Sequence, residues 1–120
     1  MINIEIPKCS LSIPVSEIHK VSSDSGVYFM RDSNGEIVYI GESLNLKKRL
    51  TKHMAGKSST TKRFYHMFHS IDVLYCDRKD RKIYELYAIN LFNPIGNVDG
   101  NESVSKVELK KRREDWIRSL

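Results

Sequence analysis

Two tyrosines on either side of a short turn are the residues whose types and spacing most suggest chemistry in this chain. Tyr28 ends the run 26–28 (Gly-Val-Tyr), and Tyr39 begins the run 39–41 (Tyr-Ile-Gly). Two phenol hydroxyls aimed at one spot, beside glycines that leave room for a backbone or a phosphate, are typical of a site. We therefore expect these two runs to line one site, with their outer glycines giving the space.

A β-hairpin would bring the two tyrosines together. Asn34-Gly35 lies between the two runs and favours a two-residue type I′ turn, in which both central residues take positive φ. Such a turn sets Tyr28 opposite Gly41 and leaves the phenols as diagonal neighbours, about 7–8 Å apart at the backbone. Side chains alternate between the faces of a strand, so the other face is expected to be the core face. It carries the apolar residues Val27, Phe29, Val38 and Ile40.

A basic helix is expected directly after the hairpin. Ser43 can cap a helix over residues 44–55, in which Arg49 and His53 are four residues apart and share one face. That face borders the expected buried stripe, so both side chains can point across the surface of the sheet. The alternative is that Arg49 is one cation among the lysines of a solvated helix. The stripe is Leu46, Leu50 and Met54, and the lysines are Lys47, Lys48 and Lys52.

An acid on a face that should be packed is the next candidate. The helical neighbours of Glu85 are apolar, so its carboxylate needs a cation, either a basic side chain or a metal. A single carboxylate suits Mg²⁺, which keeps several waters and takes one or two protein ligands. The amide of Asn97 can orient a phosphate, or this residue simply forms a turn. The neighbours of Glu85 are Ala88, Ile89 and Phe92.

The elements that must position these residues indicate a small α+β domain. We expect one or two strand-like stretches in residues 1–13 and a third strand of the hairpin sheet over residues 71–76. A second helix is expected from residue 60 or 61 to residue 69, with Phe64, Met67 and Phe68 inward. A further helix is expected over residues 77–92, ending before Pro94. A final helix should start at a Ser103 or Ser105 cap and reach Leu120, with Val107, Trp116 and Ile117 as its apolar contacts.

The charge balance favours a polyanionic partner. The chain of 120 residues carries a net charge of +5, which favours nucleic acid before a membrane. Four consecutive basic residues on the final helix form either a patch that follows phosphates or a solvated face. They are Lys110, Lys111, Arg112 and Arg113.

Metal and targeting signals are weak. Cys9 and Cys76 have no paired spacing, so neither a disulfide framework nor a four-cysteine zinc site is supported. His66 and His69 could be imagined around zinc with Cys76, but a fourth ligand is not evident, and two histidines at a solvent edge are favoured. No signal peptide or membrane span is recognisable, so we expect a cytoplasmic protein with no membrane partner.

Set together, these residues resemble the GIY-YIG nuclease family, as a standalone catalytic domain like the N-terminal domain of UvrC. The resemblance rests on five elements in order: the two tyrosine runs, Arg49 with His53, Glu85, and Asn97. It covers about residues 25–97. Val27 stands where the family has isoleucine, and the histidine position often holds tyrosine. The implied fold is a small three-stranded antiparallel sheet flanked by helices.

The resemblance implies phosphodiester hydrolysis in DNA with one Mg²⁺ or Mn²⁺ per site. Tyr28 would be the general base or hold the attacking water, with His53 assisting, and Tyr39 would position that water or a phosphate oxygen. Arg49 would neutralise charge growing on phosphorus. Glu85 would hold the metal. Asn97 matches the family's late asparagine, and Gly41, Ser43 and Lys48 are expected to contact the substrate, together with the basic run 110–113.

The domain layout and two alternatives follow. We expect one compact unit, with an extension over residues 1–24, the nuclease domain over residues 25–100 and a basic helix over residues 101–120. DNA is the expected partner, and a protein partner or a second copy could supply target recognition. The alternatives are a fold that binds nucleic acid without cutting it, and a subunit whose activity in repair or restriction needs a partner.

Overall fold

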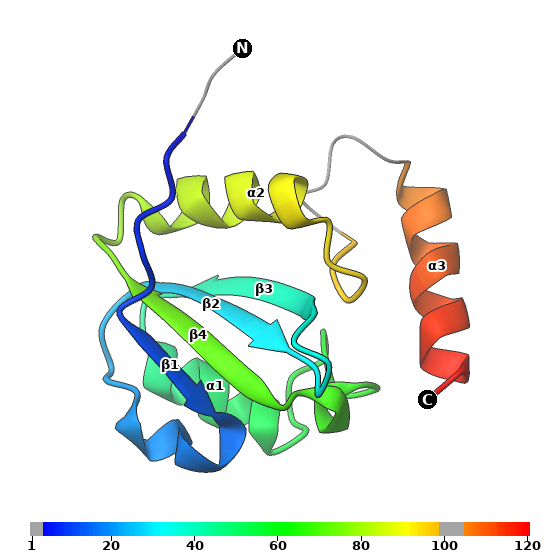
Figure 1. Ribbon diagram of the computed structural model, residues 1–120, viewed down its shortest axis with the longest axis horizontal. Helices are drawn as coiled ribbons and strands as arrows, with labels where there is room; N and C mark the ends of the chain where they lie inside the picture. Colours follow the sequence, from blue (N-terminus) through cyan, green and yellow to red (C-terminus); the bar gives the residue numbers. More distant parts are fainter. Residues whose placement is uncertain (1–3, 99–104) are drawn as a thin grey trace.

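The protein folds around a four-stranded antiparallel sheet. The structure, a computed structural model, describes residues 4–98 and 105–120 (Figure 1). The strand order is β1-β4-β2-β3, so β2 is central and β3 is an edge. The α+β class is confirmed, and β1 adds one strand to the three expected. The strands are β1 Leu11–Pro14, β2 Gly26–Arg31, β3 Ile37–Ser43 and β4 Ser70–Tyr75.

The β2–β3 hairpin forms with the expected register but a different turn. Tyr28 lies opposite Gly41 and Met30 lies opposite Tyr39, while the pairing shifts after Met30. Gly35 has a φ of 82°, whereas Asn34 does not take positive φ, so the type I′ prediction was wrong. The Asp32 carboxylate accepts hydrogen bonds from the backbone N–H groups of Asn34 and Glu36, which stabilises a longer, bulged turn.

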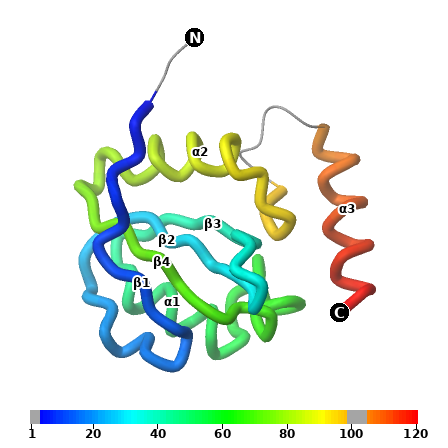
Figure 2. The backbone as a smooth tube through the Cα atoms, viewed as in Figure 1, coloured from blue at the N-terminus to red at the C-terminus, as the bar shows by residue number. Residues whose placement is uncertain are grey.

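Both faces of the sheet are covered, so both are core. Figure 1 shows α2 (Arg81–Phe92) across one face and α1 (Leu46–Met54) under the other, and Figure 2 shows the same layers as a tube. The expected core face packs on α2, but Val38 packs instead with the cluster on the α1 side. Tyr28 belongs to that second cluster and is 1% exposed. The tyrosine face is therefore a core face as well, in addition to the one expected.

The helix after the hairpin begins two residues later than expected. Asn45, not Ser43, is its N-cap, and the Asn45 side chain accepts a hydrogen bond from the Lys48 N–H. The Ser43 hydroxyl is instead bonded to the backbone of Asn45, at 3.0 Å from both its N and its O. Leu46 and Leu50 are fully buried as predicted.

The predicted helix over residues 60–69 is replaced by turns and a short 3₁₀ helix, η2 (Tyr65–Met67). Three hydroxyls explain this difference, because Ser58 bonds Thr60 and Thr61 bonds His53. Such local side-chain bonds compete with helical ones. Phe64 and Phe68 still point into the core, at 2% and 4% exposed.

The remaining elements follow the predictions in outline. The segment Val15–Lys20 is a 3₁₀ helix, η1, and α2 begins at Arg81 after a turn at residues 77–80. α2 ends at Asn93, whose φ of 50° lets the chain leave the helix before Pro94. Phe92 packs edge-on against Phe29, with ring centroids 6.3 Å apart, but stays 47% exposed, so it is only partly buried.

The final helix, α3 (Lys106–Arg118), is capped by Ser105, whose hydroxyl accepts from the Glu108 N–H. The alternative cap Ser103 lies outside the described residues. Leu109 is its buried apolar residue, while Val107 is 81% exposed, contrary to expectation. Figure 1 shows α3 standing beside the end of the sheet. Within residues 4–98 and 105–120, none of the helices combines the length and apolar character needed to cross a bilayer.

Candidate active site

A buried chain of three side chains links β2, α1 and the turn that follows α1. The Tyr28 hydroxyl lies 2.6 Å from Nε2 of His53, and Nδ1 of His53 lies 2.5 Å from the Thr61 hydroxyl. All three are at most 1% exposed. Gly41 makes this possible, because a Cβ there would lie 2.2 Å from the Tyr28 hydroxyl. The Gly41 position therefore admits the phenol, rather than a phosphate.

Electrostatics keep the Tyr28–His53 pair neutral in the protein without metal. Burial lowers the pKa of His53 to about 3, and the positive charge of Arg49 adds to this effect. Burial likewise raises the pKa of Tyr28, while a hydrogen bond from the Arg49 side chain opposes that rise. We assign the phenol proton toward His53 Nε2, because Arg49 donates to the phenol oxygen. The remaining imidazole proton then sits on Nδ1 and is donated to Thr61.

Tyr39 lies where several charged groups meet. Its ring centroid lies 6.3 Å from that of Tyr28 and 5.6 Å from that of His53. Its hydroxyl donates to Thr60 at 3.4 Å. Burial raises the pKa of Tyr39, whereas the charges of Arg49 and of an α3 residue, Arg113, lower it. The structure thus brings Tyr28, Tyr39, Arg49 and His53 together as predicted.

Glu85 faces this cluster from α2, across strand β3. It lines a cavity of about 440 Å³ together with Tyr39 and Asn97. Burial, followed by the negative charge of Glu42, raises the pKa of Glu85 to about 7. The Glu85 carboxylate accepts a hydrogen bond from the backbone of Glu42, and the Glu42 side chain pairs with Arg81 at 2.6 Å.

The donor set around Glu85 fits Mg²⁺ better than zinc. No cluster of three or more His, Cys, Asp or Glu side chains suited to a metal occurs among the described residues, so a zinc cage is not supported there. A half-buried carboxylate with a like-charged neighbour is stabilised by an added cation. Mg²⁺ needs one or two such ligands and fills its other positions with water and phosphate oxygens. Glu85 is therefore the residue that could hold it.

Asn97 serves the backbone of β3. Its amide oxygen accepts from the Ile40 N–H and its amide nitrogen donates to the Ile40 carbonyl, each at 2.8 Å. Gly96 adds a backbone bond to Val38 at 2.7 Å. The loop thus pairs with the outer edge of β3 as a further strand would. The amide groups bond the backbone, so Asn97 fixes the strand that carries Tyr39 instead of pointing its amide at a phosphate.

The residues expected to bind substrate separate into different places. Ser43, whose hydroxyl is bonded to Asn45, and the exposed Lys48 line one shallow basic groove together with Arg49 and Lys52. The basic run on α3 does not share one surface. Within it, Arg113 lines the cavity of Glu85, Arg112 lines a separate groove beside Pro94, and Lys110 and Lys111 are exposed.

Sequence reasoning missed Thr61, Glu42 and Arg63. Thr61 orients His53, and Arg63 lines the cavity. The backbone of Glu42 donates a hydrogen bond to the Glu85 carboxylate, while the negative charge of the Glu42 side chain repels that carboxylate. Glu42 could have been predicted from the sequence. Side chains alternate along a strand, so Glu42 lies on the same face as Ile40, which is the face that packs on α2. Thr61 and Arg63 lie in a segment that was expected to be helical, so their directions could not be read from the sequence.

The part of the chain that carries these residues is similar to known proteins. A model of the GIY-YIG catalytic domain matches residues 24–98. UvrABC system protein C from Methylococcus capsulatus is 51% identical over 37 residues, which are 31% of this chain and 6% of that protein. The same protein from Cronobacter sakazakii is 33% identical over 86 residues, which are 69% of this chain and 14% of that protein. The match thus spans a small part of these relatives.

A solved structure shares the fold. The GIY-YIG N-terminal endonuclease domain of UvrC from Thermotoga maritima, bound to magnesium as its catalytic divalent cation, superposes with a TM-score of 0.62 at 21% identity. The match covers 69% of this chain and 93% of that one. α3 lies outside residues 24–98, the part that the family model matches.

Proposed function

Since the chain belongs to the GIY-YIG catalytic domain family, we propose that it is a metal-dependent endonuclease that hydrolyses phosphodiester bonds in DNA. The observation that carries this proposal is the convergence of Tyr28, Tyr39, Arg49 and Glu85 on one edge of the sheet. It is supported by the net charge of +5, which favours a polyanionic substrate. The magnesium-bound endonuclease domain with the same fold supports the same type of reaction and the same metal.

The buried triad is suited to move one proton from the attacking water. Water attacks phosphorus, the bond to the 3′ oxygen breaks, and the water proton must go to a base. Tyr28 holds that water and passes its own proton to Nε2 of His53, which Thr61 keeps unprotonated by accepting from Nδ1. This role needs cations beside the phenol, because the pKa of Tyr28 is raised by burial. Arg49 is one such cation.

The other residues act on the phosphate. Arg49 donates to the oxygens on which charge grows, since a planar guanidinium has several donors. Tyr39 orients the water or a non-bridging oxygen. Glu85 would hold Mg²⁺, which when bound stabilises the leaving 3′ oxygen and supplies a water that protonates it.

The DNA backbone would run over basic residues on either side of Arg49. Lys48 and Lys52 line the groove on the α1 side, and Arg113 of α3 lines the cavity. Contacts of this kind position a duplex without reading its sequence. A protein partner or a second copy would supply target choice.

A plasmid assay tests the proposal. Purified protein is mixed with supercoiled plasmid in Mg²⁺, in Mn²⁺ and in EDTA, and nicked and linear products are followed on a gel. We expect nicking only with metal, and none with Glu85→Gln or Arg49→Ala. Lys47→Ala is the matched control for Arg49, because Lys47 is an exposed cation of the same helix, away from the basic groove. Tight binding with intact plasmid under all conditions would instead identify a non-cleaving module.

A further inference from the structure

One wall of the cavity beside Tyr39 comes from outside the matched domain. Glu85 of α2 lines the cavity, and so do Arg63, from the turn after α1, and Arg113 of α3. The positive charges of Arg113 and Arg49 lower the pKa of the Tyr39 hydroxyl, while the negative charge of Glu85 raises it. The C-terminal helix thus brings a cation to the tyrosine at the centre of the site.

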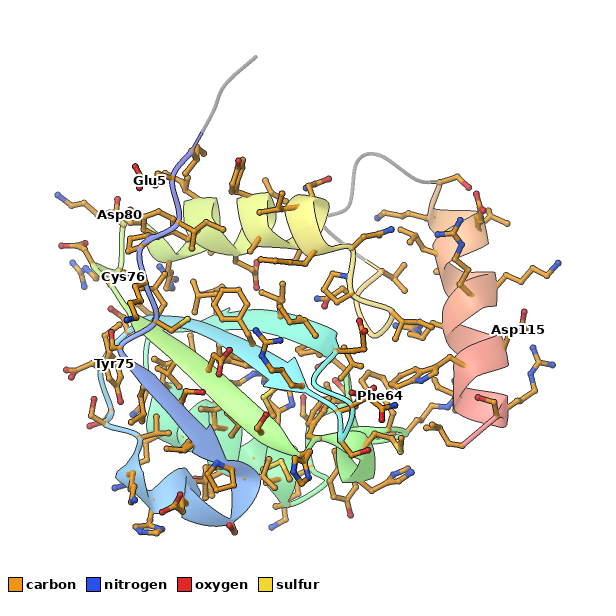
Figure 3. All side chains as sticks on the ribbon, viewed as in Figure 1. Glu5, Phe64, Tyr75, Cys76, Asp80 and Asp115 are labelled. Atoms are coloured by element: carbon orange, nitrogen blue, oxygen red, sulfur yellow. The ribbon has the colours of Figure 1, made fainter. Side chains whose placement is uncertain are left out.

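Two contacts hold α3 in this place. The guanidinium of Arg63 donates to both oxygens of Glu114, at 2.5 and 2.9 Å. The rings of Phe64 and Trp116 pack with centroids 5.1 Å apart in an edge-to-face arrangement. Figure 3 shows Phe64 at the end of the sheet that faces α3. Arg63 is therefore hydrogen-bonded to Glu114, whereas Arg113 acts on that carboxylate through its charge.

The Arg113 side chain has a hydrogen-bond donor that a ligand could use. It is half-buried, and its Nε is buried with no hydrogen-bond partner within the described part of the chain. A buried N–H of a charged group without an acceptor is costly, and a phosphate oxygen entering the cavity would remove that cost. The guanidinium fork matches phosphate geometry, with two parallel N–H donors.

We propose that Arg113 binds a DNA phosphate inside the cleavage cavity, adjacent to the phosphate that Tyr39 and Arg49 face, and that docked α3 is the wall that places it there. The proposal rests on the proposed nuclease function for the identity of the ligand as DNA. The residues next to Arg113 in the sequence do not share its position, because consecutive residues of a helix are turned by about 100° from one another. Arg112 accordingly lines the groove beside Pro94 and pairs with Glu108 at 2.7 Å.

Equilibrium binding and cleavage by the full chain test the proposal. A fluorescently labelled short DNA duplex is titrated in EDTA at several salt concentrations, with Arg113→Ala compared with Arg118→Ala. Arg118 lies on the same helix, is exposed and pairs with Asp115, so its loss changes the charge equally without touching the cavity. We expect Arg113→Ala to bind about tenfold more weakly, with a salt slope lower by about one, and Arg118→Ala to change affinity less than about twofold.

The emission of Trp116, the single tryptophan of the chain, separates binding from helix docking. Arg113→Ala should leave this emission unchanged, because Phe64 still packs on the ring. A shifted emission would mean that Arg113 only holds α3 and would overturn the proposal. Equal losses of duplex affinity in Arg113→Ala and Arg118→Ala would overturn the proposal as well, since they would show a general effect of charge.

A second variant tests the role of docking. Glu114→Ala removes the acceptor of Arg63 and should shift Trp116 emission and weaken duplex binding, with little further loss when Arg113→Ala is added. If the losses of duplex affinity in the two variants were fully additive, this would contradict the proposal that docked α3 places Arg113 in the cavity. If the wild type binds duplex with this pattern but never cleaves plasmid, the nuclease proposal fails and the phosphate site remains.

Discussion

The hydroxyl oxygen of Tyr28 lies 2.6 Å from Nε2 of His53, inside the core and next to Tyr39, which lines the cavity. The phenol and the imidazole are neutral there, because burial raises the pKa of the one and lowers that of the other. When the phenol passes its proton to Nε2 of His53, the resulting phenolate and imidazolium lie side by side, so neither charge is left unpaired. This arrangement suits a base that becomes active when cations and substrate arrive.

Replacing Tyr28 by phenylalanine should stop cleavage without unfolding the protein. The change removes the hydroxyl but keeps the ring, and leaves His53 Nε2 buried without its partner, at a cost of about 1–3 kcal/mol. Plasmid nicking should fall at least about 100-fold, while urea unfolding remains cooperative. Tyr65→Phe, in η2, is the control and should cleave normally. Wild-type rates in Tyr28→Phe would remove Tyr28 from the mechanism.

Replacing Thr61 by valine should slow cleavage about tenfold. Valine keeps the shape but offers no acceptor for His53 Nδ1, so the imidazole loses its fixed tautomer. Thr61→Ser restores the hydroxyl and should restore the rate. The pH–rate profile of Thr61→Val should shift as well, because the hydrogen bond influences the basicity of Nε2. A slow valine variant that serine does not rescue would indicate a packing role instead.

The metal-free protein should become less stable as pH rises through the range of Glu85. Its pKa is raised from 4.5 to about 7, so the folded state binds this proton more tightly than the unfolded state. The stabilisation is complete below pH 4.5 and is lost as pH rises through 7. Glu85→Gln should abolish this component, worth about 1 kcal/mol after allowing for solvent screening. Thermal unfolding in EDTA between pH 4.5 and 8 measures it, and an unchanged profile in the variant would contradict the assignment.

Binding of Mg²⁺ should show the opposite pH dependence. The cation needs the ionised carboxylate, so protons compete with it below the pKa of about 7. We expect the rise in melting temperature caused by Mg²⁺ to be larger at pH 8 than at pH 6, and absent in Glu85→Gln. An equal response of the variant would place the metal elsewhere.

Replacing Asn97 by alanine should destabilise the edge of the sheet. The two hydrogen bonds to Ile40 are lost, leaving a buried N–H and C=O without partners, at a cost of about 2–4 kcal/mol. Asn97→Asp keeps the acceptor but sets a carboxylate oxygen against the Ile40 carbonyl, so it should be stabilised when protonated at low pH. Urea unfolding at two pH values distinguishes these cases. An alanine variant of normal stability with lost cleavage would instead support a direct contact with phosphate.

The local pattern of residues was enough to predict the pairing of Tyr28 with Gly41, the shared face of Val27, Phe29 and Ile40, and the family. These features depend on local rules: alternation along a strand sets Tyr28 opposite Gly41, and the order and spacing of the five elements is a property of the chain. The helical acid Glu85 was found in the same way, because its apolar neighbours are fixed by the helical period.

Tertiary structure alone decided how those residues are used. Whether the tyrosine face is open or buried depends on what packs over it, and α1 covers it, so Tyr28 became a core residue. The hydroxyls of residues 58–61 bond one another and His53 in place of a helix, which sequence periodicity does not encode. The place of Arg113 beside Tyr39 likewise follows from long-range contacts, Arg63 with Glu114 and Phe64 with Trp116, between segments about 50 residues apart. Contacts at such separations depend on the complete fold, so no local pattern could predict them.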